Sequence, residues 1–147
     1  MDIYERLIEL RDAERFGNLI GMKHVKVERG YAEAELPVRP EFINLQGTIH
    51  GGVLLTLADV TGGTAACSYG KIVATVDNSY HFLRAKKDIK KLIAKATTIK
   101  AGRTIIVNDV KVLDQDGTLL GEGIFSYLPL DLPVETFEPV ATAEHNN

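Results

Sequence analysis

The segment from residue 50 to residue 69, HGGVLLTLADVTGGTAACSY, is apolar or small at nearly every position and carries a single carboxylate, Asp59. A helix that is apolar on every face is buried inside a protein. We therefore predict one long buried helix over residues 51 to about 69. Gly62, Gly63 and three threonines are poor helix formers, and we interpret the two glycines as positions where another part of the backbone comes close to the helix.

The whole chain has the composition of one ordinary domain. It has 147 residues, 45% of them apolar and 25% charged, with a net charge of −3. A chain of this length builds a single core, and an acidic balance argues against a nucleic-acid surface, which needs a basic surplus. Cys67 is the only cysteine, which excludes an intrachain disulfide and fits a reducing compartment.

The N-terminus and the hydropathy of the chain predict where the protein resides. The first sixteen residues, MDIYERLIELRDAERF, are charged throughout and lack the apolar run of a signal peptide. No stretch approaches the roughly 20 apolar residues of a membrane-spanning helix. We expect a soluble cytoplasmic protein that binds neither membrane nor nucleic acid.

The rest of the chain predicts the partners of the buried helix. Residues 3 to 15 place apolar side chains on one face of a helix. Residues 24 to 38 form two extended pieces with a turn or bulge at Gly30, and residues 40 to 49 form a loop. Four segments rich in β-branched and aromatic residues follow: 72–83, 91–100, 104–113 and 118–128.

The connections between these four segments are short, so consecutive strands should pair antiparallel. A helix that is apolar all round needs cover on most sides, and a curved sheet wrapped round it provides that cover. We therefore predict an α+β fold in which a curved antiparallel sheet wraps round one long central helix. We predict one domain, residues 1–147, with a peripheral N-terminal helix (1–18) and a peripheral tail (130–147).

Asp59 is the first candidate for chemistry. Aspartate is a poor residue for a helix interior and is rarely buried without a partner. A buried Asp59 must therefore have polar partners or a changed pKa. For the residue alone, the simpler interpretation is a structural carboxylate held by N–H groups or hydroxyls of a neighbouring strand.

The start of the helix offers a complementary feature. Gly51 and Gly52 stand where free backbone N–H groups favour negative charge, and without Cβ atoms they let a ligand oxygen come close. Asn44 and His50 add polar side chains beside them. The glycines could instead form a tight turn, and His50 could tie down the loop. Taken together, an oxyanion donor and a carboxylate suggest the addition of water to a carbonyl group.

Other motifs are absent or weak. No Gly-x-Ser-x-Gly stretch supports a serine nucleophile, and no phosphate-loop or dinucleotide fingerprint is present. Cys67 lies in the apolar helix and is expected to be an inert buried thiol. The four histidines are too scattered in sequence to suggest a metal site: His24, His50, His81 and His145. We expect no metal and no cofactor.

Residues 44–59, NLQGTIHGGVLLTLAD, resemble the signature of the hotdog-fold acyl-CoA thioesterases of the phenylacetate-degradation type. That signature has Asn, Gly three residues later, His-Gly-Gly, and Asp nine residues after the His. The matching positions are Asn44, Gly47, His50, Gly51, Gly52 and Asp59. Residues 74–84 and 99–127 resemble later strands of the family. The family usually has Pro-Ala after Phe-Leu-Arg, whereas Arg84 is here followed by Ala85, Lys86 and Lys87.

The resemblance implies a role for each matching residue. Asp59 would activate the attacking water or attack the thioester itself, and the Gly51 N–H would polarise the thioester carbonyl. Asn44 and His50 would position the thioester, and Thr75 would orient the water. Coenzyme A, as part of the substrate, would be bordered by Phe82, Leu83, Arg84, Ala85, Lys86, Lys87, Lys100, Ala101, Gly102, Arg103 and Thr104.

The resemblance also implies an assembly, with a homodimer as the minimal unit and a homotetramer as the expected state. Geometry agrees with the dimer. Gly51 and Asp59 are eight residues apart, which is about 12 Å along a helix, so one helix can hardly serve both ends of one small group. Two antiparallel helices related by a twofold axis could do so.

Acyl-CoA thioester hydrolysis is the function that we expect. The alternatives are a hotdog enoyl-CoA hydratase or dehydratase, which would use His50 and Asp59 for proton transfer, and a non-catalytic acyl-CoA-binding module, since fold does not fix function. The basic stretches RAKKDIKK and KAGR could be solvated turns or a landing site for the phosphates of coenzyme A. The identity of the acyl group cannot be deduced from the sequence.

Overall fold

A computed structural model of the chain describes residues 1–140. Two short helices, α1 (Ile3–Asp12) and α2 (Arg15–Ile20), precede a strand pair, a 3₁₀ turn, one long helix and four more strands. These elements are β1 (Lys23–Glu28), β2 (Tyr31–Pro37), η1 (Pro40–Phe42), α3 (Gly51–Cys67), β3 (Lys71–Phe82), β4 (Lys91–Ala101), β5 (Ile106–Asp114) and β6 (Leu119–Pro133).

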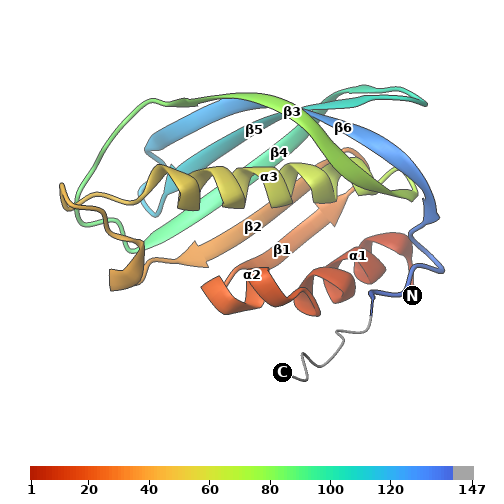
Figure 1. Cartoon of the computed structure of the whole chain (residues 1–147), viewed down its shortest axis with the longest axis horizontal. Coiled ribbons are helices and arrows are strands. Elements are labelled where there is room, and N and C mark those ends of the chain that lie inside the picture. The colour runs from red at the N-terminus through yellow and green to blue at the C-terminus, as the bar shows by residue number, and fades with distance from the viewer. Residues whose placement is uncertain (141–147) are drawn as a thin grey trace, which may run out of the picture.

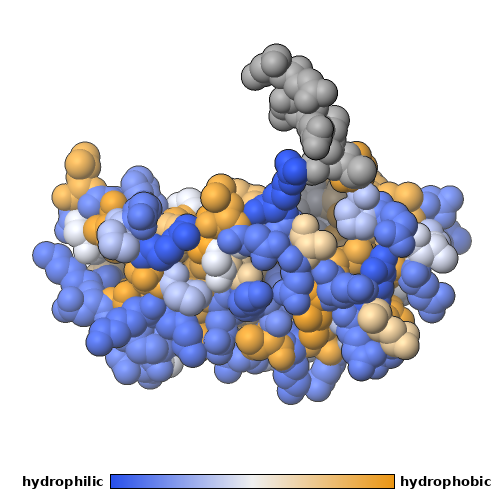
Figure 2. Space-filling model, turned by 90° about the horizontal axis from the view of Figure 1, so that it is seen from below, coloured by the Kyte–Doolittle hydropathy of each residue, from blue (hydrophilic) through white to orange (hydrophobic). Residues whose placement is uncertain are grey.

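All six strands form one antiparallel sheet in the order β1-β2-β4-β5-β6-β3. The sheet curves round α3, and α1 and α2 lie below it (Figure 1). This is the predicted arrangement of a curved sheet round one central helix. The face on which α1 and α2 lie is largely hydrophilic, with apolar side chains in small groups (Figure 2). Within the described residues, no helix is both long enough and apolar enough to cross a membrane.

The element boundaries differ from the prediction at both ends of the chain. The N-terminal helix was predicted as one piece, but α1 ends at Asp12 and α2 begins at Arg15. The tail was predicted from residue 130, but β6 continues to Pro133, where its last residues pair with β3 alone. Proline is tolerated where a strand end needs no donor on one side. Residues 141–147 of that tail lie outside the described part of the chain.

Small residues let α3 lie close to the sheet. Alternate positions of β2 and β4 point toward the helix and are fully buried, and four of them are alanines: Ala32, Ala34, Ala94 and Ala96. On the helix, the residues from Thr61 to Ser68 are all buried, as an all-apolar helix requires.

Gly62 is the position of α3 that the sheet approaches most closely. The predicted neighbour was backbone, but the structure places a side chain there. A Cβ at position 62 would collide with the Tyr127 hydroxyl and would lie 3.0 Å from a methyl of Val110. The Nδ2 of Asn108, a fully buried residue of β5, also donates to the Gly62 carbonyl at 2.7 Å. The glycine therefore lets two buried polar side chains reach the helix backbone.

Two alanine substitutions in α3 should have opposite effects. Gly62→Ala should lower the free energy of unfolding by about 1–3 kcal/mol, because overpacking forces Tyr127 and Val110 to move. Gly52→Ala is the matched control, because no atom outside its own stretch of helix backbone lies within 4 Å of its Cβ position, and it should gain up to about 1 kcal/mol in helix propensity. Urea unfolding at one fixed protein concentration measures both, and equal effects of the two substitutions would contradict this account.

Candidate active site

Asp59 lies in the middle of α3 and is partly buried. Its Oδ1 accepts a hydrogen bond of 2.9 Å from the Thr75 hydroxyl of β3. The Tyr127 hydroxyl of β6 donates to the Asp59 backbone carbonyl at 2.8 Å and lies 3.3 Å from Oδ1. Within residues 1–140, no hydrogen bond reaches Oδ2. One carboxylate oxygen is thus held in place while the other remains available to a water or a substrate atom.

Tyr127 is a site residue that sequence reasoning missed. Burial, then the charge of Asp59 and the hydrogen bond to it, raise the pKa of Tyr127 above its ordinary value. The hydroxyl therefore stays protonated and acts as a donor at any physiological pH. One feature of the sequence could have pointed to Tyr127. It is a tyrosine on the inward face of a predicted strand, and a buried tyrosine needs a partner for its hydroxyl. That partner is 68 residues away in sequence, and the pattern does not identify it.

The start of α3 forms a second group of site residues. Gly51 is the first helical residue, and exposed His50 is the N-cap without a side-chain capping bond. The Phe82 ring packs against Gly51, where a Cβ would lie only 2.9 Å from the ring edge. A cavity of about 370 Å³ opens beside it. It is lined by Asn44, Gln46, Thr48, Ile49, Gly51, Leu54, Phe82, Arg84 and Ala85.

Asn44 has a clear structural contact in this group. Its Oδ1 accepts from the backbone N–H groups of Gln46 and Thr48, both at 3.0 Å, and its Nδ2 donates to the Thr48 hydroxyl at 3.0 Å. These bonds hold the loop that leads into α3. The Asn44 side-chain amide therefore stabilises the loop that precedes α3.

The two groups do not meet within one chain. Asp59 is not among the residues that line the cavity at Gly51, and eight residues of helix separate the two positions, which is about 12 Å. The addition of water to a carbonyl needs both a carboxylate and an oxyanion donor. The group at Asp59 has the carboxylate, and the group at Gly51 has the backbone N–H groups.

The residues predicted to border coenzyme A also fall into two places. Phe82, Arg84 and Ala85 line the cavity at the start of α3. Gly102 and Arg103 line a smaller cavity with Ala66 and Tyr69, at the other end of the helix. Of the remaining predicted positions, Leu83, Lys87, Lys100, Ala101 and Thr104 are exposed to solvent.

Lys86 forms ion pairs with two aspartates of the same chain. Its ammonium group pairs with the buried Asp114 carboxylate at 2.5 Å and with Asp116 at 3.4 Å. The hydrogen bond to Asp114 is the main reason why the pKa of Lys86 is raised. Desolvation opposes ionisation of Asp114, but the bonds from Lys86 and from two backbone N–H groups outweigh it and lower the pKa of Asp114. Lys87, beside Gly47, is the neighbouring lysine with no ion pair in the described chain.

The histidines are dispersed in the structure as well. His24 is buried in β1, with its Nε2 2.9 Å from the Thr64 hydroxyl, while His50 and His81 are exposed. His145 lies outside the described residues. Within residues 1–140, no cluster of three His, Cys, Asp or Glu side chains could hold a metal ion. Cys67 is buried, and burial raises the pKa of its thiol, which makes it a poor nucleophile.

A curved antiparallel sheet wrapped round one long central helix is the hotdog fold. The family model of the thioesterase superfamily matches residues 46–120. The chain belongs to that superfamily.

Three comparisons illustrate the relationship. An Archaeoglobus fulgidus protein named "Putative esterase" is 30% identical over 98 residues, which are 67% of this chain and 58% of that protein. A Streptococcus pneumoniae structure, titled a hypothetical thioesterase protein with coenzyme A, is 25% identical and has a TM-score of 0.77 over 85% of this chain and 98% of its own. The Escherichia coli PaaI protein, from the phenylacetic acid degradation operon, shares the fold, with 18% identity and a TM-score of 0.83 over 90% and 99% of the two chains.

The buried histidine predicts a pH-dependent stability. Burial, and secondly the charge of Arg11, lower the pKa of His24 from 6.5 to about 3. Between these two values the unfolded chain binds a proton that the folded chain does not, so stability falls as the pH is lowered through this range. The expected slope from His24 approaches about 1.4 kcal/mol per pH unit.

Urea unfolding of the wild type and of His24→Gln between pH 7 and pH 4 should therefore diverge, because glutamine can occupy the site without titrating. The matched control, exposed His81→Gln, should follow the wild type. Parallel curves for the wild type and His24→Gln would show that this histidine does not govern the acid response.

Proposed function

We propose that this protein hydrolyses acyl-CoA thioesters to a carboxylic acid and coenzyme A, as a hotdog thioesterase of the phenylacetate-degradation type. The observation that carries the proposal is the Asp59 carboxylate in the middle of a buried helix, with Oδ1 held by Thr75 at 2.9 Å. A binding module has little use for a carboxylate held with one free oxygen. Membership of the thioesterase superfamily and the coenzyme A named with the Streptococcus pneumoniae relative support a coenzyme A thioester as the substrate.

The proposed chemistry uses Asp59 in one of two ways. As a general base, it takes a proton from water while the water oxygen attacks the thioester carbonyl carbon. As a nucleophile, it forms a mixed anhydride that water then cleaves. In both cases the carbon–sulfur bond breaks, the coenzyme A thiolate leaves and takes up a proton, and the carbonyl oxygen carries negative charge in between. Backbone N–H groups at Gly51 are suited to that charge.

We further propose that each site is shared between two subunits. β3 is an outer strand of the sheet, twelve residues long, and most of its side chains are exposed. An outer strand of this length invites pairing with another strand. If two β3 strands pair across a twofold axis, the two α3 helices run antiparallel, and the start of one faces the middle of the other. Gly51 of one subunit then complements Asp59 of its partner.

The proposed pairing of two subunits would also bring together the residues predicted to bind coenzyme A. The two groups of predicted binding residues lie at opposite ends of α3, and an antiparallel helix pair places one group of each subunit near the other group of its partner. We propose Arg84, Lys87 and Arg103 as contacts for the phosphates, rather than Lys86, whose charge is already paired with Asp114. The homotetramer implied by the resemblance would be a pair of such dimers.

Replacing Asp59 with asparagine tests the chemical role. Asp59→Asn keeps the shape of the side chain but removes the base and the nucleophile, so kcat for thiol release should fall by about 10²-fold or more. Thiol release from a panel of aryl and straight-chain acyl-CoAs is the measurement. Asp12→Asn, an exposed aspartate of α1, is the control and should retain normal turnover. Near-normal turnover by folded Asp59→Asn would refute the role, and loss of enoyl absorbance without thiol release would favour a hydratase.

Mixed dimers test the shared site. Asn44→Ala removes the bonds that shape the loop before α3, and Asp59→Asn removes the carboxylate, so each variant alone should be weakly active. When the two are co-expressed with different tags, a mixed dimer has one site with both defects and one site with none. Purified mixed dimers should therefore regain roughly half of the wild-type activity. If verified mixed dimers stay as inactive as their parents, the site is built within one chain.

A further inference from the structure

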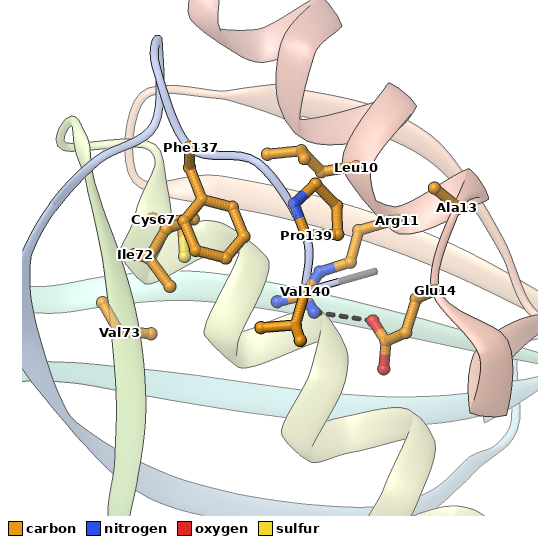
Figure 3. Close-up of a pocket in the computed structure, with 10 residues that line it drawn as sticks. All are labelled: Leu10, Arg11, Ala13, Glu14, Cys67, Ile72, Val73, Phe137, Pro139 and Val140. Atoms are coloured by element: carbon orange, nitrogen blue, oxygen red, sulfur yellow. Dashed lines mark hydrogen bonds and ion pairs between the residues drawn. The ribbon is translucent and has the colours of Figure 1, made fainter. Parts of the chain in front are cut away.

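A mainly apolar cavity lies at the far end of α3 from Gly51. It has a volume of about 320 Å³ and opens between the end of α1, the end of α3, the start of β3 and residues 137–140 (Figure 3). Its walls are Leu10, Arg11, Ala13, Glu14, Cys67, Ile72, Val73, Phe137, Pro139 and Val140. A dry cavity of about 150 Å³ already accepts benzene, so this one has room for a phenyl ring with a short linker or for a medium-length alkyl chain.

The cavity lies at the end of a row of residues on α3 that begins at the candidate carboxylate. Asp59, Gly63 and Cys67 follow one another at intervals of four residues, so they form one row on the surface of α3. β3 runs along this row, with Thr75 bonded to Asp59 at 2.9 Å. Val73, two residues before Thr75 and on the same face of the strand, lines the cavity together with Cys67.

The middle of this row has no side chain. A Cβ at Gly63 would meet its nearest neighbours, Arg11 Nη2 and Tyr127 Cε1, at 3.5 Å, which is ordinary contact. Along this row the helix thus presents a carboxylate, then a position without a side chain that Arg11 and Tyr127 adjoin, then Cys67 in the wall of the apolar cavity.

The charges in the cavity wall are already satisfied by the protein. Arg11 donates from Nη1 to Glu14 at 2.7 Å and from Nε to the Thr64 hydroxyl at 2.8 Å. Figure 3 shows this ion pair at one side of the cavity, with Ile72, Val73 and Phe137 on the other. The remaining surface is aliphatic, aromatic or thiol, and an anionic group placed there would lie near the Glu14 carboxylate. Such a surface suits an uncharged apolar group.

We propose that this cavity is the acyl subsite, and that it selects apolar aryl or medium-length aliphatic acyl groups over short or anionic ones. The proposal rests on the proposed function, because it takes Asp59 as the reacting carboxylate. The carbonyl end of the acyl group lies at Asp59 and its apolar end passes Gly63 toward Cys67. α1 and residues 137–140, which flank the sheet, thereby become determinants of specificity.

Filling the cavity from the side remote from Asp59 tests the proposal. Leu10→Trp places a larger side chain into the cavity from α1, and Ile72→Phe does so from β3 should the first variant fold poorly. kcat/KM for octanoyl-CoA should fall by about tenfold or more, while kcat/KM for acetyl-CoA, which does not reach the cavity, stays within about twofold. Leu19→Trp is the matched control, because Leu19 of α2 is exposed. Equal losses for both substrates, or no loss in a folded variant, would overturn the assignment.

Binding of S-octyl-coenzyme A, a thioether that cannot be hydrolysed, separates this proposal from the catalytic one. Calorimetry should give wild-type affinity for Leu19→Trp and an affinity weaker by about tenfold or more for Leu10→Trp, with unchanged binding of coenzyme A itself. If the wild type binds the thioether in this pattern but hydrolyses no acyl-CoA, the proposed function fails and the subsite stands. If Leu10→Trp binds the thioether as well as the wild type does, or the wild type binds it no better than coenzyme A, the subsite is refuted.

Discussion

The contact between the Tyr127 hydroxyl and the backbone of α3 at Asp59 is the constraint on which the rest of the site depends. A carboxylate in the middle of a buried helix is costly unless polar groups meet it. Tyr127 and Thr75 supply those groups, from β6 and β3. The tyrosine can reach the helix only because position 62 has no side chain. The propensity lost with a glycine in a helix, about 1 kcal/mol, is thus accepted in exchange for the placement of Asp59.

That constraint also explains why the sheet must be wide and curved. β6 has to bring Tyr127 against the helix from one side, while β3 brings Thr75 to the same carboxylate. These strands are neighbours in the sheet, whereas the helix that they hold lies between β2 and β3 in the chain. β3 is left as an outer strand, with its side chains largely exposed. The feature that completes the surroundings of Asp59 is therefore also the feature that offers an edge to a second subunit.

Much of this fold follows from the sequence, because its dominant signal is strong and local. An apolar run of nearly twenty residues with a single carboxylate identifies α3, and four β-rich segments with short connections identify an antiparallel sheet. The motif from Asn44 to Asp59 identifies the candidate site residues. What the sequence does not contain is the set of long-range contacts. Neither the bond from Tyr127 to Asp59 nor the pairing of Lys86 with Asp114 has a local pattern, so neither contact could be predicted from the sequence.

The strand ends show the same limit. The tail was predicted from residue 130 onward on the general ground that the ends of a chain are usually the least ordered part of a domain. In the structure the end of β6 pairs only with β3, and the residue after it, Val134, is fully buried. The segment that follows supplies Phe137 to the wall of the apolar cavity.

The two ends of α3 differ in polarity, and this difference favours one orientation of an acyl-CoA in the proposed site. The first turn is partly exposed at Gly51 and exposed at Gly52, and Arg84 lines the cavity beside it. The last two turns are buried, and Arg11, the cation in the wall of the apolar cavity, is neutralised by Glu14. A polyanion such as coenzyme A is better solvated at an exposed, cationic surface, and an alkyl or aryl group is better placed in the buried end. With antiparallel helices, the exposed start of α3 in one subunit faces the Asp59 carboxylate of the other. The thioester joins the coenzyme A part of the substrate to its acyl part. It therefore comes to the boundary between the polar and the apolar region. In the proposed dimer Asp59 stands at that boundary, and this placement accounts for the one carboxylate in a helix that is apolar elsewhere.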